Sequence, residues 1–398
     1  MPKVLHILNR PHFGGPILYA GSLIQSINKD FESRLLVGEL SPKEEDATAI
    51  LTNFGIKPMV VKGMERNISP WNDFKVYWRL RRIIRHYNPD IVHTNGAKAG
   101  ALGRLAANHE RVPVIIHTFH GHVFKAYFSR PVSWMFLQIE RYLANITTKI
   151  ISISKQQTIE LCNEFHVAEL DKIETIPLGF DFNRFVTDQA VKRKRFRDEF
   201  KISDDAICIG IVGRMVPVKD HKFFIKAISK ILREAKVPIK AFIVGDGETR
   251  NAIEEYAVAL GLPFTNEYDR KHQHPLIFTS WRTDIDCVFA GLDIVTLCSK
   301  NEGTPVTLME AQAAEKPIVA TKVGGVMDTV LEGETALLCE AGDLDGYCQQ
   351  LLSLVHDAEI RHRLTTKSRS FVLKNFHHSE FIQNTESLYR RLIAATKK

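Results

Sequence analysis

A loop in the second half of the chain has the composition of a phosphate-binding helix N-terminus. It follows an apolar run over residues 293–299 and reads Asn-Glu-Gly-Thr-Pro-Val-Thr-Leu-Met-Glu from residue 301 to 310. Thr304 is a good N-cap and Pro305 suits the first helical position, so we expect a helix to begin here. The backbone N–H groups of Gly303, Thr304 and Val306 would then be free to bind an anion, most naturally a phosphate.

Two carboxylates flank this loop. Glu302 lies at its entrance and Glu310 about one and a half turns inside the expected helix. Neither can hold phosphate, but each can accept hydrogen bonds from sugar hydroxyls on either side of it. The alternative is an ordinary capped helix with two solvated glutamates.

Two further loops carry groups of the same kind. Arg214 and Lys219 follow the strand-like run 206–212, where they could face one diphosphate. The arginine would bind it through two parallel hydrogen bonds and the lysine as a point charge. A solvated turn is the alternative there. Near the N-terminus, Gly14 and Gly15 lie between the first strand-like run and the first helical pattern, again a phosphate-type position.

A histidine follows a strand-like run in the first half. His120 comes shortly after residues 114–118 and precedes a glycine, so it is well placed to reach a ligand. His122 lies two residues on, which raises a metal site as an alternative. Because no Asp or Glu lies nearby to complete a ligand set, we expect no metal here.

The elements that must position these loops alternate along the chain. Two successive series of strand-like runs, each with helical patterns between the runs, indicate βαβ units and parallel sheets. We expect strands at residues 4–8, 34–38, 58–61, 91–93, 114–118 and 149–153, and then at 206–212, 239–244, 276–278, 293–297 and 317–320. The predicted fold is therefore α/β, with two doubly wound domains whose ligands bind at the carboxyl ends of the strands.

Composition and charge exclude several classes of protein. With 44% apolar and 25% charged residues, the 398-residue chain can bury cores and is not disordered. It contains no apolar segment long enough to span a membrane and no signal-peptide pattern at its start, so we expect a cytoplasmic protein. The net charge of +7 forms no dense basic stripe, which argues against nucleic acid as a partner.

In sequence order, these segments resemble the retaining glycosyltransferases of glycosyltransferase family 4. Residues 302–310 match the family's pair of glutamates separated by seven residues, and Gly213-Arg214 with Lys219 matches its G-R…K element. Gly14-Gly15, the segment His-Thr-Phe-His-Gly-His around His120, and Val244-Gly245-Asp246-Gly247 also match, as do residues 93–100, 176–179 and 323–325.

The resemblance implies a role for each matched residue. Arg214 and Lys219 would neutralise the donor diphosphate, while Glu302 would bind the transferred sugar and Glu310 the ribose. His120 would touch the donor sugar near the reacting carbon, and Arg282 would contact the nucleotide base. Further donor contacts are implied for Gly14, Gly15, Gly245, Gly303, Thr304, Pro305 and Val306. The chain departs from the family at Ser280-Trp281, where a glycine is usual.

The resemblance also implies the fold and the reaction. The fold would be GT-B, with an N-terminal domain over residues 1–180, a linker over 181–200, a donor-binding domain over 201–375, and a C-terminal helix over 376–398 that returns to the first domain. The reaction would transfer a sugar with retention from a nucleoside-diphosphate sugar, UDP favoured, without metal or cofactor. The implied setting is the synthesis of cell-surface polysaccharide or glycolipid.

Other functions remain as alternatives. A nucleotide-sugar epimerase shares this architecture, and a two-domain sugar-binding protein would close on its ligand without chemistry. The chain lacks both the G-x-G-x-x-G pattern of a dehydrogenase and the P-loop pattern of a kinase.

The acceptor is a saccharide or a lipid-linked saccharide on this interpretation. Aromatic and basic residues mix over residues 71–85 and 124–136, a composition that suits peripheral contact with the anionic inner face of a membrane. The alternative is that the aromatic side chains form the buried faces of helices that cover the sheet.

Overall fold

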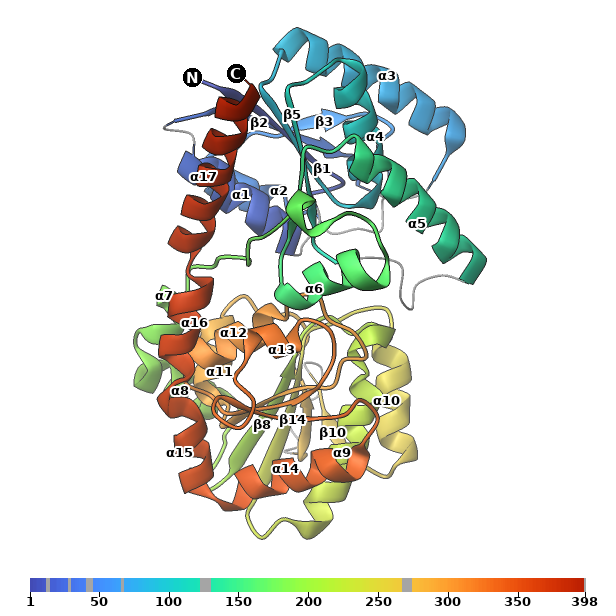
Figure 1. The fold of residues 1–398 in the computed structure, drawn as a ribbon. Helices are drawn as coiled ribbons and strands as arrows, with labels where there is room; N and C mark the ends of the chain where they lie inside the picture. The colour runs from blue at the N-terminus through green and yellow to red at the C-terminus, as the bar shows by residue number, and fades with distance from the viewer. Residues whose placement is uncertain are drawn as a thin grey trace. The chain divides into compact units, whose positions relative to one another are not determined.

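The computed structural model describes residues 1–11, 15–27, 30–40, 46–65, 68–121, 130–266 and 274–396. Within these residues the chain divides into two compact units (Figure 1). Unit 1 comprises Met1–Phe180 and His378–Lys398, and unit 2 comprises Asp181–His377. The expected α/β alternation is confirmed, because each unit contains one seven-stranded parallel sheet with helices on both faces.

The sheet of unit 1 has the strand order β3-β2-β1-β4-β5-β6-β7. Its strands are β1 (Lys3–Leu8), β2 (Glu32–Gly38), β3 (Met59–Val61), β4 (Ile91–Asn95), β5 (Val114–Phe119), β6 (Lys149–Ser152) and β7 (Ile173–Thr175). The central strands β1, β4 and β5 are buried over almost their whole length, as is typical of parallel strands covered on both faces. The three-residue strand β7 was not predicted.

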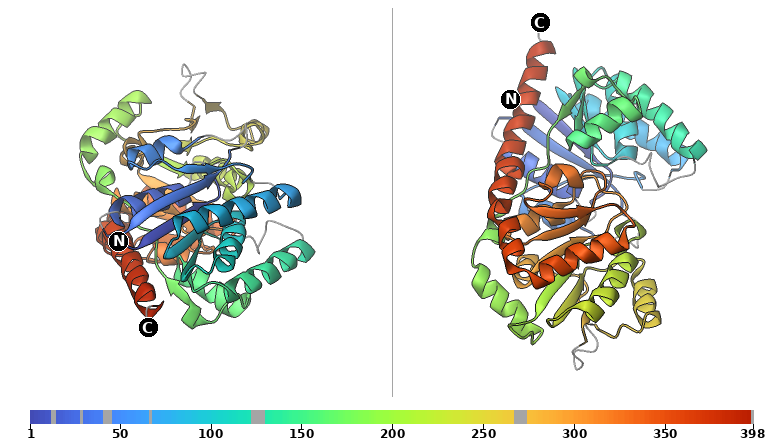
Figure 2. Two further views of the ribbon diagram at one scale, coloured as in Figure 1. Left: turned by 90° about the horizontal axis from the view of Figure 1, so that it is seen from above. Right: turned by 60° about the horizontal axis from the view of Figure 1, so that its bottom comes forward.

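Helices cover both faces of this sheet. Apolar side chains of α1 and α17 pack on one face, and those of α3 and α4 pack on the other. The helix α17, red in Figures 1 and 2, lies along α1 and places Phe381, Leu388 and Tyr389 in the core of unit 1. The helices are α1 (Gly15–Ile27), α2 (Thr48–Asn53), α3 (Pro70–Tyr87), α4 (Ala97–His109), α5 (Arg130–Asn145), α6 (Lys155–Ile159) and α17 (His378–Thr396).

The sheet of unit 2 has the strand order β10-β11-β9-β8-β12-β13-β14. Its strands are β8 (Ile207–Val212), β9 (Ile239–Val244), β10 (Phe264–Thr265), β11 (Leu276–Phe278), β12 (Ile294–Leu297), β13 (Ile318–Thr321) and β14 (Ala336–Cys339). The short edge strands β10 and β14 were not predicted.

The helices of unit 2 include two in the segment that was expected to be a linker. Residues 181–200 contain α7 (Asn183–Val186) and α8 (Gln189–Glu199), and α8 packs against α11 within unit 2. The remaining helices are α9 (His221–Glu234), α10 (Arg250–Ala259), α11 (Ile285–Gly291), α12 (Val306–Ala313), α13 (Val326–Thr329), α14 (Leu344–His356), α15 (Ala358–Thr366) and α16 (Ser368–Phe376).

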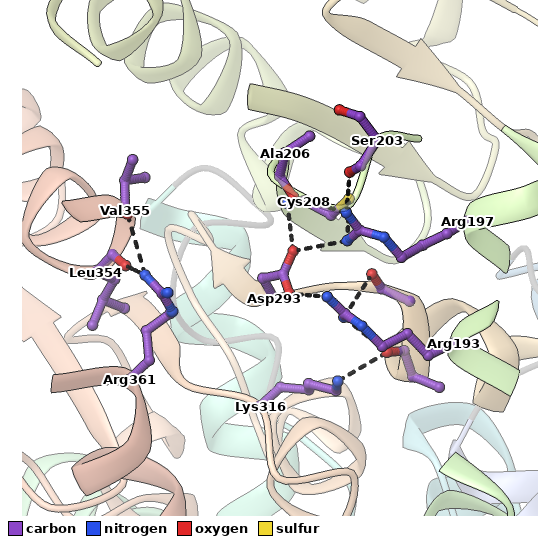
Figure 3. A network of polar contacts seen from close by, with 12 residues as sticks. Arg193, Arg197, Ser203, Ala206, Cys208, Asp293, Lys316, Leu354, Val355 and Arg361 are labelled. Carbon is purple, nitrogen blue, oxygen red and sulfur yellow. Dashed lines mark hydrogen bonds and ion pairs between the residues drawn. The ribbon is translucent and has the colours of Figure 1, made fainter. Parts of the chain in front are cut away.

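A charged cluster around Asp293 holds α8 against the start of β8 (Figure 3). The Asp293 carboxylate accepts hydrogen bonds from Arg193 Nη2 at 2.7 Å, Arg197 Nη1 at 3.3 Å and the Cys208 N–H at 2.8 Å. Nearby, Lys316 Nζ donates to the Ala290 carbonyl at 2.9 Å. Arg197 is 6% exposed, and among the described residues Asp293 is the carboxylate that compensates its charge.

We predict that Asp293→Ala lowers the free energy of unfolding by about 3 to 5 kcal/mol, because it leaves the buried Arg197 charge uncompensated. Urea unfolding monitored by circular dichroism measures the change. The matched control is Asp198→Ala, which removes an exposed pair with Lys194 and costs less than about 1 kcal/mol. Equal losses for both variants would show that the cluster does not anchor α8.

Candidate functional site

Backbone contacts that only glycine permits bring the loops at the carboxyl edge of the unit 2 sheet together. A Cβ atom on Gly245 would lie under 3.0 Å from the Gly213 carbonyl oxygen, which no real Cβ atom does. A Cβ atom on Gly325 would overlap the Gly303 carbonyl oxygen in the same way. The Gly325 N–H also donates to the Glu302 carbonyl at 3.0 Å. The glycine-rich loops after β9 and β13 therefore fix the loops after β8 and β12.

These contacts bring Lys219 and Glu302 together. Lys219 Nζ lies 2.6 Å from Glu302 Oε1, and the Ser299 hydroxyl donates to the same oxygen. Lys219 comes from the loop after β8, and Ser299 and Glu302 come from the loop after β12, the neighbouring strand. Both charged side chains are largely buried, and each compensates the other. Arg214, on the same loop as Lys219, is exposed.

The helix after Glu302 begins one residue later than expected. It starts at Val306, with Pro305 at the N-cap position, so the assignment of Thr304 as N-cap was wrong. Pro305 adopts an extended conformation with ψ of 94°, and no side chain caps the helix. Proline offers no side-chain acceptor to the first N–H groups of α12, of which that of Leu308 donates to the Pro305 carbonyl at 3.0 Å. The Thr304 hydroxyl is buried and has no hydrogen-bond partner among the described residues.

Glu310 lies on α12 close to one cation. Its Oε1 is 3.9 Å from Arg184 Nη2, which comes from α7. Burial raises the pKa of Glu310 to about 7, and the Arg184 charge acts in the opposite direction. Glu310 is therefore partly protonated near neutral pH in the free protein. As a carboxylate it accepts hydrogen bonds, and as a carboxylic acid it can also donate one.

The loop after β11 joins the same edge through Gly245 and Asp246. The Gly245 N–H donates to the Ser280 carbonyl at 3.0 Å, and the Ser280 hydroxyl donates to Asp246 Oδ2 at 2.9 Å. Ser280 has a φ of +57°, the left-handed conformation that explains why a glycine would be usual here. These bonds set the position of Trp281, which is 51% exposed.

Arg282 joins this loop to the end of α8 and to the residue before α11. Its guanidinium donates to both oxygens of Glu199, at 2.6 and 2.8 Å, and to both oxygens of Asp284, at 2.8 Å each. Glu199 ends α8 and Asp284 precedes α11. The structure thus places Arg282 between two carboxylates, which engage four of its five N–H donors.

In unit 1, His120 follows β5 and is held on two sides. His120 Nε2 lies 2.8 Å from Asn95 Oδ1, and the Tyr19 ring packs edge-on against the imidazole, with 4.8 Å between centroids. Burial lowers the pKa of His120 to about 3, so its ring is neutral near pH 7. Gly15 begins α1 at the same edge of the sheet, while Gly14 lies outside the described residues.

A buried hydrogen-bonded chain leads from Tyr19 to the C-terminal helix. The Tyr19 hydroxyl lies 3.2 Å from Thr118 Oγ1, which lies 2.7 Å from His93 Nε2. The opposite nitrogen of His93 is 2.5 Å from the Tyr389 hydroxyl on α17. Burial holds the pKa of His93 well below its usual range, so the chain consists of neutral groups.

No cluster of three or more His, Cys, Asp or Glu side chains that could hold a metal ion occurs among the described residues. His122, raised as a second ligand beside His120, lies outside them. Likewise, no described helix has the length and apolarity that a bilayer crossing requires.

Comparison with known proteins identifies the family. Residues 18–184 match the family model described as Glycosyltransferase Family 4, and residues 192–371 match the one described as Glycosyl transferases group 1. The chain belongs to these glycosyltransferases.

Individual relatives match over most of their length. The Escherichia coli UDP-Gal:alpha-D-GlcNAc-diphosphoundecaprenol alpha-1,3-galactosyltransferase is 26% identical over 91% of this chain and 89% of its own. The Staphylococcus aureus capsular polysaccharide biosynthesis glycosyltransferase CapM is 26% identical over 83% of this chain and 84% of its own. The crystal structure of Anabaena Alr3699/HepE in complex with UDP superposes with a TM-score of 0.81, at 20% identity over 98% of this chain and all of that one. The fold is GT-B, as predicted.

Sequence reasoning missed several residues at these edges. Ser299 lies three residues before Glu302 and could have been considered as its partner from that spacing. Arg184 is distant from Glu310 in sequence, and Asn95 is distant from His120. The sequence contains no signal for these two contacts, because they depend on how separate loops meet.

We predict that Gly325→Ala lowers glycosyltransferase activity at least about tenfold while the protein stays folded. Gly325 has a φ of −72°, which alanine adopts freely, so the effect arises from the overlap with Gly303. Initial rates and urea unfolding are measured together. The control is Gly333→Ala, in open space with a φ of +77°, which loses stability but keeps its activity. Full activity in Gly325→Ala would mean that the close contact does not position the loop of Glu302.

Proposed function

We propose that the protein transfers a sugar from a nucleoside-diphosphate sugar, with UDP favoured as the nucleotide, to a saccharide or lipid-linked acceptor with retention of anomeric configuration. The biological setting would be the synthesis of cell-surface polysaccharide or glycolipid. The E. coli relative, named for a UDP-galactose donor and a diphosphoundecaprenol-linked acceptor, supports this class. So does the UDP complex of the Anabaena structure. The observation that carries the proposal is the Lys219–Glu302 pair beside the uncapped start of α12.

The donor half of the proposed site lies on unit 2. Lys219 and Arg214 would bind the diphosphate together with the N–H groups of the loop that leads into α12. Glu302 would accept hydrogen bonds from hydroxyls of the transferred sugar, and Glu310 from the ribose. We propose that Arg282 contacts the base from the loop that carries Ser280 and Trp281, with Glu199 and Asp284 holding its guanidinium in place. Gly15 and His120 would contribute from unit 1.

The proposed reaction develops negative charge on the leaving diphosphate. The bond between the anomeric carbon and the diphosphate oxygen breaks, so negative charge grows on the diphosphate, where Lys219 and Arg214 stabilise it. We propose no metal or cofactor in this step and therefore expect full activity in excess EDTA. Retaining glycosidases use a carboxylate nucleophile. We propose instead a front-face displacement, in which the departing diphosphate accepts the proton of the attacking acceptor hydroxyl.

We predict different effects for the two partners of the ion pair. Lys219→Ala should weaken UDP binding about 10- to 150-fold, the equivalent of roughly 1.5 to 3 kcal/mol for one charge-assisted contact. Glu302→Ala should keep or increase its affinity for UDP, because Lys219 no longer pairs with Glu302, yet lose turnover because the sugar is no longer oriented. Calorimetry with UDP and initial rates of UDP release from UDP-glucose and UDP-galactose in EDTA measure both effects.

The control for these variants is Lys230→Ala, which removes an exposed ion pair with Asp345 on α14. UDP affinity unchanged in Lys219→Ala would refute the diphosphate assignment. Product analysis by NMR reads the anomeric configuration, and an inverted product would contradict retention. Conversion of the donor sugar without UDP release would identify an epimerase instead.

For a lipid-linked acceptor, we propose a surface on unit 1. The buried residues of α3 are Val76, Leu80, Arg81, Ile84 and Tyr87. Tyr87 is therefore a core residue, whereas Trp71, Phe74 and Trp78 are exposed. The exposed aromatic and apolar side chains of α3 and α5 are Trp71, Phe74, Trp78, Trp134, Met135, Ile139 and Tyr142. Both helices contact α4, so they cover the same face of the sheet. We propose that this surface contacts an anionic membrane, with Lys75 and Arg82 as exposed cations.

We predict that the protein co-sediments with vesicles containing anionic phospholipid at low salt and dissociates at high salt, because screening weakens the cationic contribution. Replacing Trp71, Phe74 and Trp78 by serine should reduce the bound fraction at least about fivefold. The control is Trp281→Ser, which removes a half-exposed tryptophan from unit 2. Equal binding by the triple variant and the wild type would exclude α3 from membrane contact.

A further inference from the structure

A cavity of about 540 Å³ lies in unit 1 beside β2. Its volume falls within the roughly 300 to 1,000 Å³ that small-molecule sites occupy. Four basic side chains line it, those of Arg34, Lys57, Arg82 and His86, and none of the described residues that line it is a carboxylate. Its apolar lining includes Ile24, Leu35, Leu36, Ile56, Met59 and Ile83. The cavity therefore combines basic groups with an aliphatic wall.

The cavity lies where the pairing of strands stops. β3 pairs with β2 from Leu36 to Gly38, so the earlier residues of β2 have no described strand beside them on that side. Leu35 belongs to the apolar core that α1 and α2 cover, and Leu36 belongs to the core that α3 covers. Because consecutive side chains of a strand point to opposite faces, a cavity lined by both residues lies at the edge of the sheet.

The basic side chains of α3 differ in their partners. Arg81 donates to Glu110 at 2.6 Å, and Arg85 donates to both oxygens of the same carboxylate, at 2.9 and 3.1 Å. Arg82 and His86 are exposed, and neither has an ion pair or hydrogen bond with a described residue. The two residues of α3 that line the cavity with basic groups are thus the ones whose N–H donors are available to an anion.

Two further groups of the lining have no partner among the described residues. Lys57 is exposed and forms no ion pair with them. Ser33 Oγ is buried and forms no hydrogen bond with them. A buried hydroxyl without a partner costs free energy, which a ligand oxygen would restore by pairing with it. Arg34 differs, because its guanidinium carbon lies 4.3 Å from the centroid of the Tyr87 ring and its Nη2 lies 3.5 Å from Glu32.

These features select an amphiphilic anion as the ligand. The unpaired donors suit a phosphate, which offers several acceptor oxygens and a negative charge. The aliphatic wall suits hydrocarbon, which gains free energy by leaving water. Inorganic phosphate would leave the wall wet, and a zwitterionic headgroup would find no carboxylate for its cation among the described lining residues. A phospholipid with a net negative charge matches both parts of the cavity.

The cavity is separate from the residues of unit 1 that are proposed to act in sugar transfer. Leu5 and Arg34, which line it, lie in the first halves of β1 and β2. Gly15 and His120 instead follow the carboxyl ends of β1 and β5. In open parallel sheets the reacting ligand binds at the carboxyl ends of the strands. A molecule in this cavity would therefore be held without being converted.

We propose that this cavity binds one anionic phospholipid molecule, which anchors unit 1 without taking part in sugar transfer. Its phosphate would bind Lys57, Arg82 and His86, and the upper parts of its acyl chains would contact the aliphatic wall. Arg82 comes four residues after the exposed Trp78, one turn further along the same face of α3. The inference rests on the proposed membrane contact for the source of the lipid and adds a specific site to it.

Isothermal calorimetry with dissolved short-chain lipid tests the proposal. The probe is dihexanoyl phosphatidylglycerol, kept below the concentration at which it forms micelles and added to the whole chain. We expect it to bind at least about tenfold more tightly than dihexanoyl phosphatidylcholine, which has the same chains but no net charge. It should also bind at least about tenfold more tightly than glycerol 3-phosphate, which lacks the chains. Absence of binding, or equal affinity for the probe and either analogue, would overturn the proposal.

Substitutions on α3 locate the site. The double variant Arg82→Ala with His86→Ala should weaken binding of the probe at least about tenfold, because two contacts to the phosphate are lost. The matched control is Arg85→Ala, which removes a basic side chain from the same helix and leaves Arg81 paired with Glu110. The control should bind the probe as tightly as the wild type. Equal losses in both variants would show that the net charge of α3, and not the cavity, attracts the lipid.

Ser33→Ala separates a contact with the ligand from a role in the fold. Because the hydroxyl has no described partner in the free protein, its removal should leave the midpoint of urea unfolding unchanged or raise it. Affinity for the probe should fall about two- to tenfold, since one hydrogen bond to the lipid is lost. A variant that loses stability but keeps its affinity would overturn the assignment of the lipid to this cavity.

Dissolved lipid also separates this proposal from the membrane contact of α3. The variant with serine at Trp71, Phe74 and Trp78 should bind the probe with wild-type affinity, because none of the three side chains lines the cavity. Binding of vesicles without binding of the probe would refute the cavity site and keep the membrane contact. Binding of the probe without binding of vesicles would keep the cavity site and refute the membrane contact.

Discussion

The close approach of loop backbones in unit 2 is the constraint on which its site depends. Gly245 contacts the backbone at Gly213, and Gly325 contacts it at Gly303, at separations that exclude any side chain. These contacts join loops from neighbouring strands, so the positions of Lys219 and Glu302 are set by main chain rather than by flexible side chains. A site held in this way loses little conformational entropy when a ligand binds.

Unit 1 positions its residues by a different means. Its edge relies on a buried network of neutral side chains that runs from Asn95 and His120 through Tyr19 to Tyr389 on α17. Because α17 comes from the end of the chain, a helix distant in sequence helps to fix the residues after β4 and β5. Burial keeps the histidines neutral, so the network offers directed hydrogen bonds without the cost of a buried charge.

The sequence predicted the fold well because both sheets are built from long apolar runs separated by turn residues. The strands it missed, β7, β10 and β14, are short or lie at sheet edges, where the apolar signal is weak. Strand ends, glycines and charges coincide in the loops after β8 and β12, and this coincidence is why the sequence singled out these loops. Partners within the loops were not predictable. Spacing alone could not show that Arg282 lies between Glu199 and Asp284, or that Pro305 precedes the helix instead of beginning it.

The Lys219–Glu302 pair also affects the binding free energy of a ligand at this edge of the unit 2 sheet. At 2.6 Å the two charges compensate each other in the free protein, so neither is left buried and unpaired. A diphosphate that binds Lys219 therefore exchanges one anionic partner for another, and its net gain is smaller than the full interaction. The exchange also releases the Glu302 oxygen that Lys219 holds, which makes that oxygen available to a hydroxyl. In the proposed donor complex, diphosphate binding and sugar recognition would thus be coupled through one ion pair, with Ser299 keeping the carboxylate in place while its partner changes.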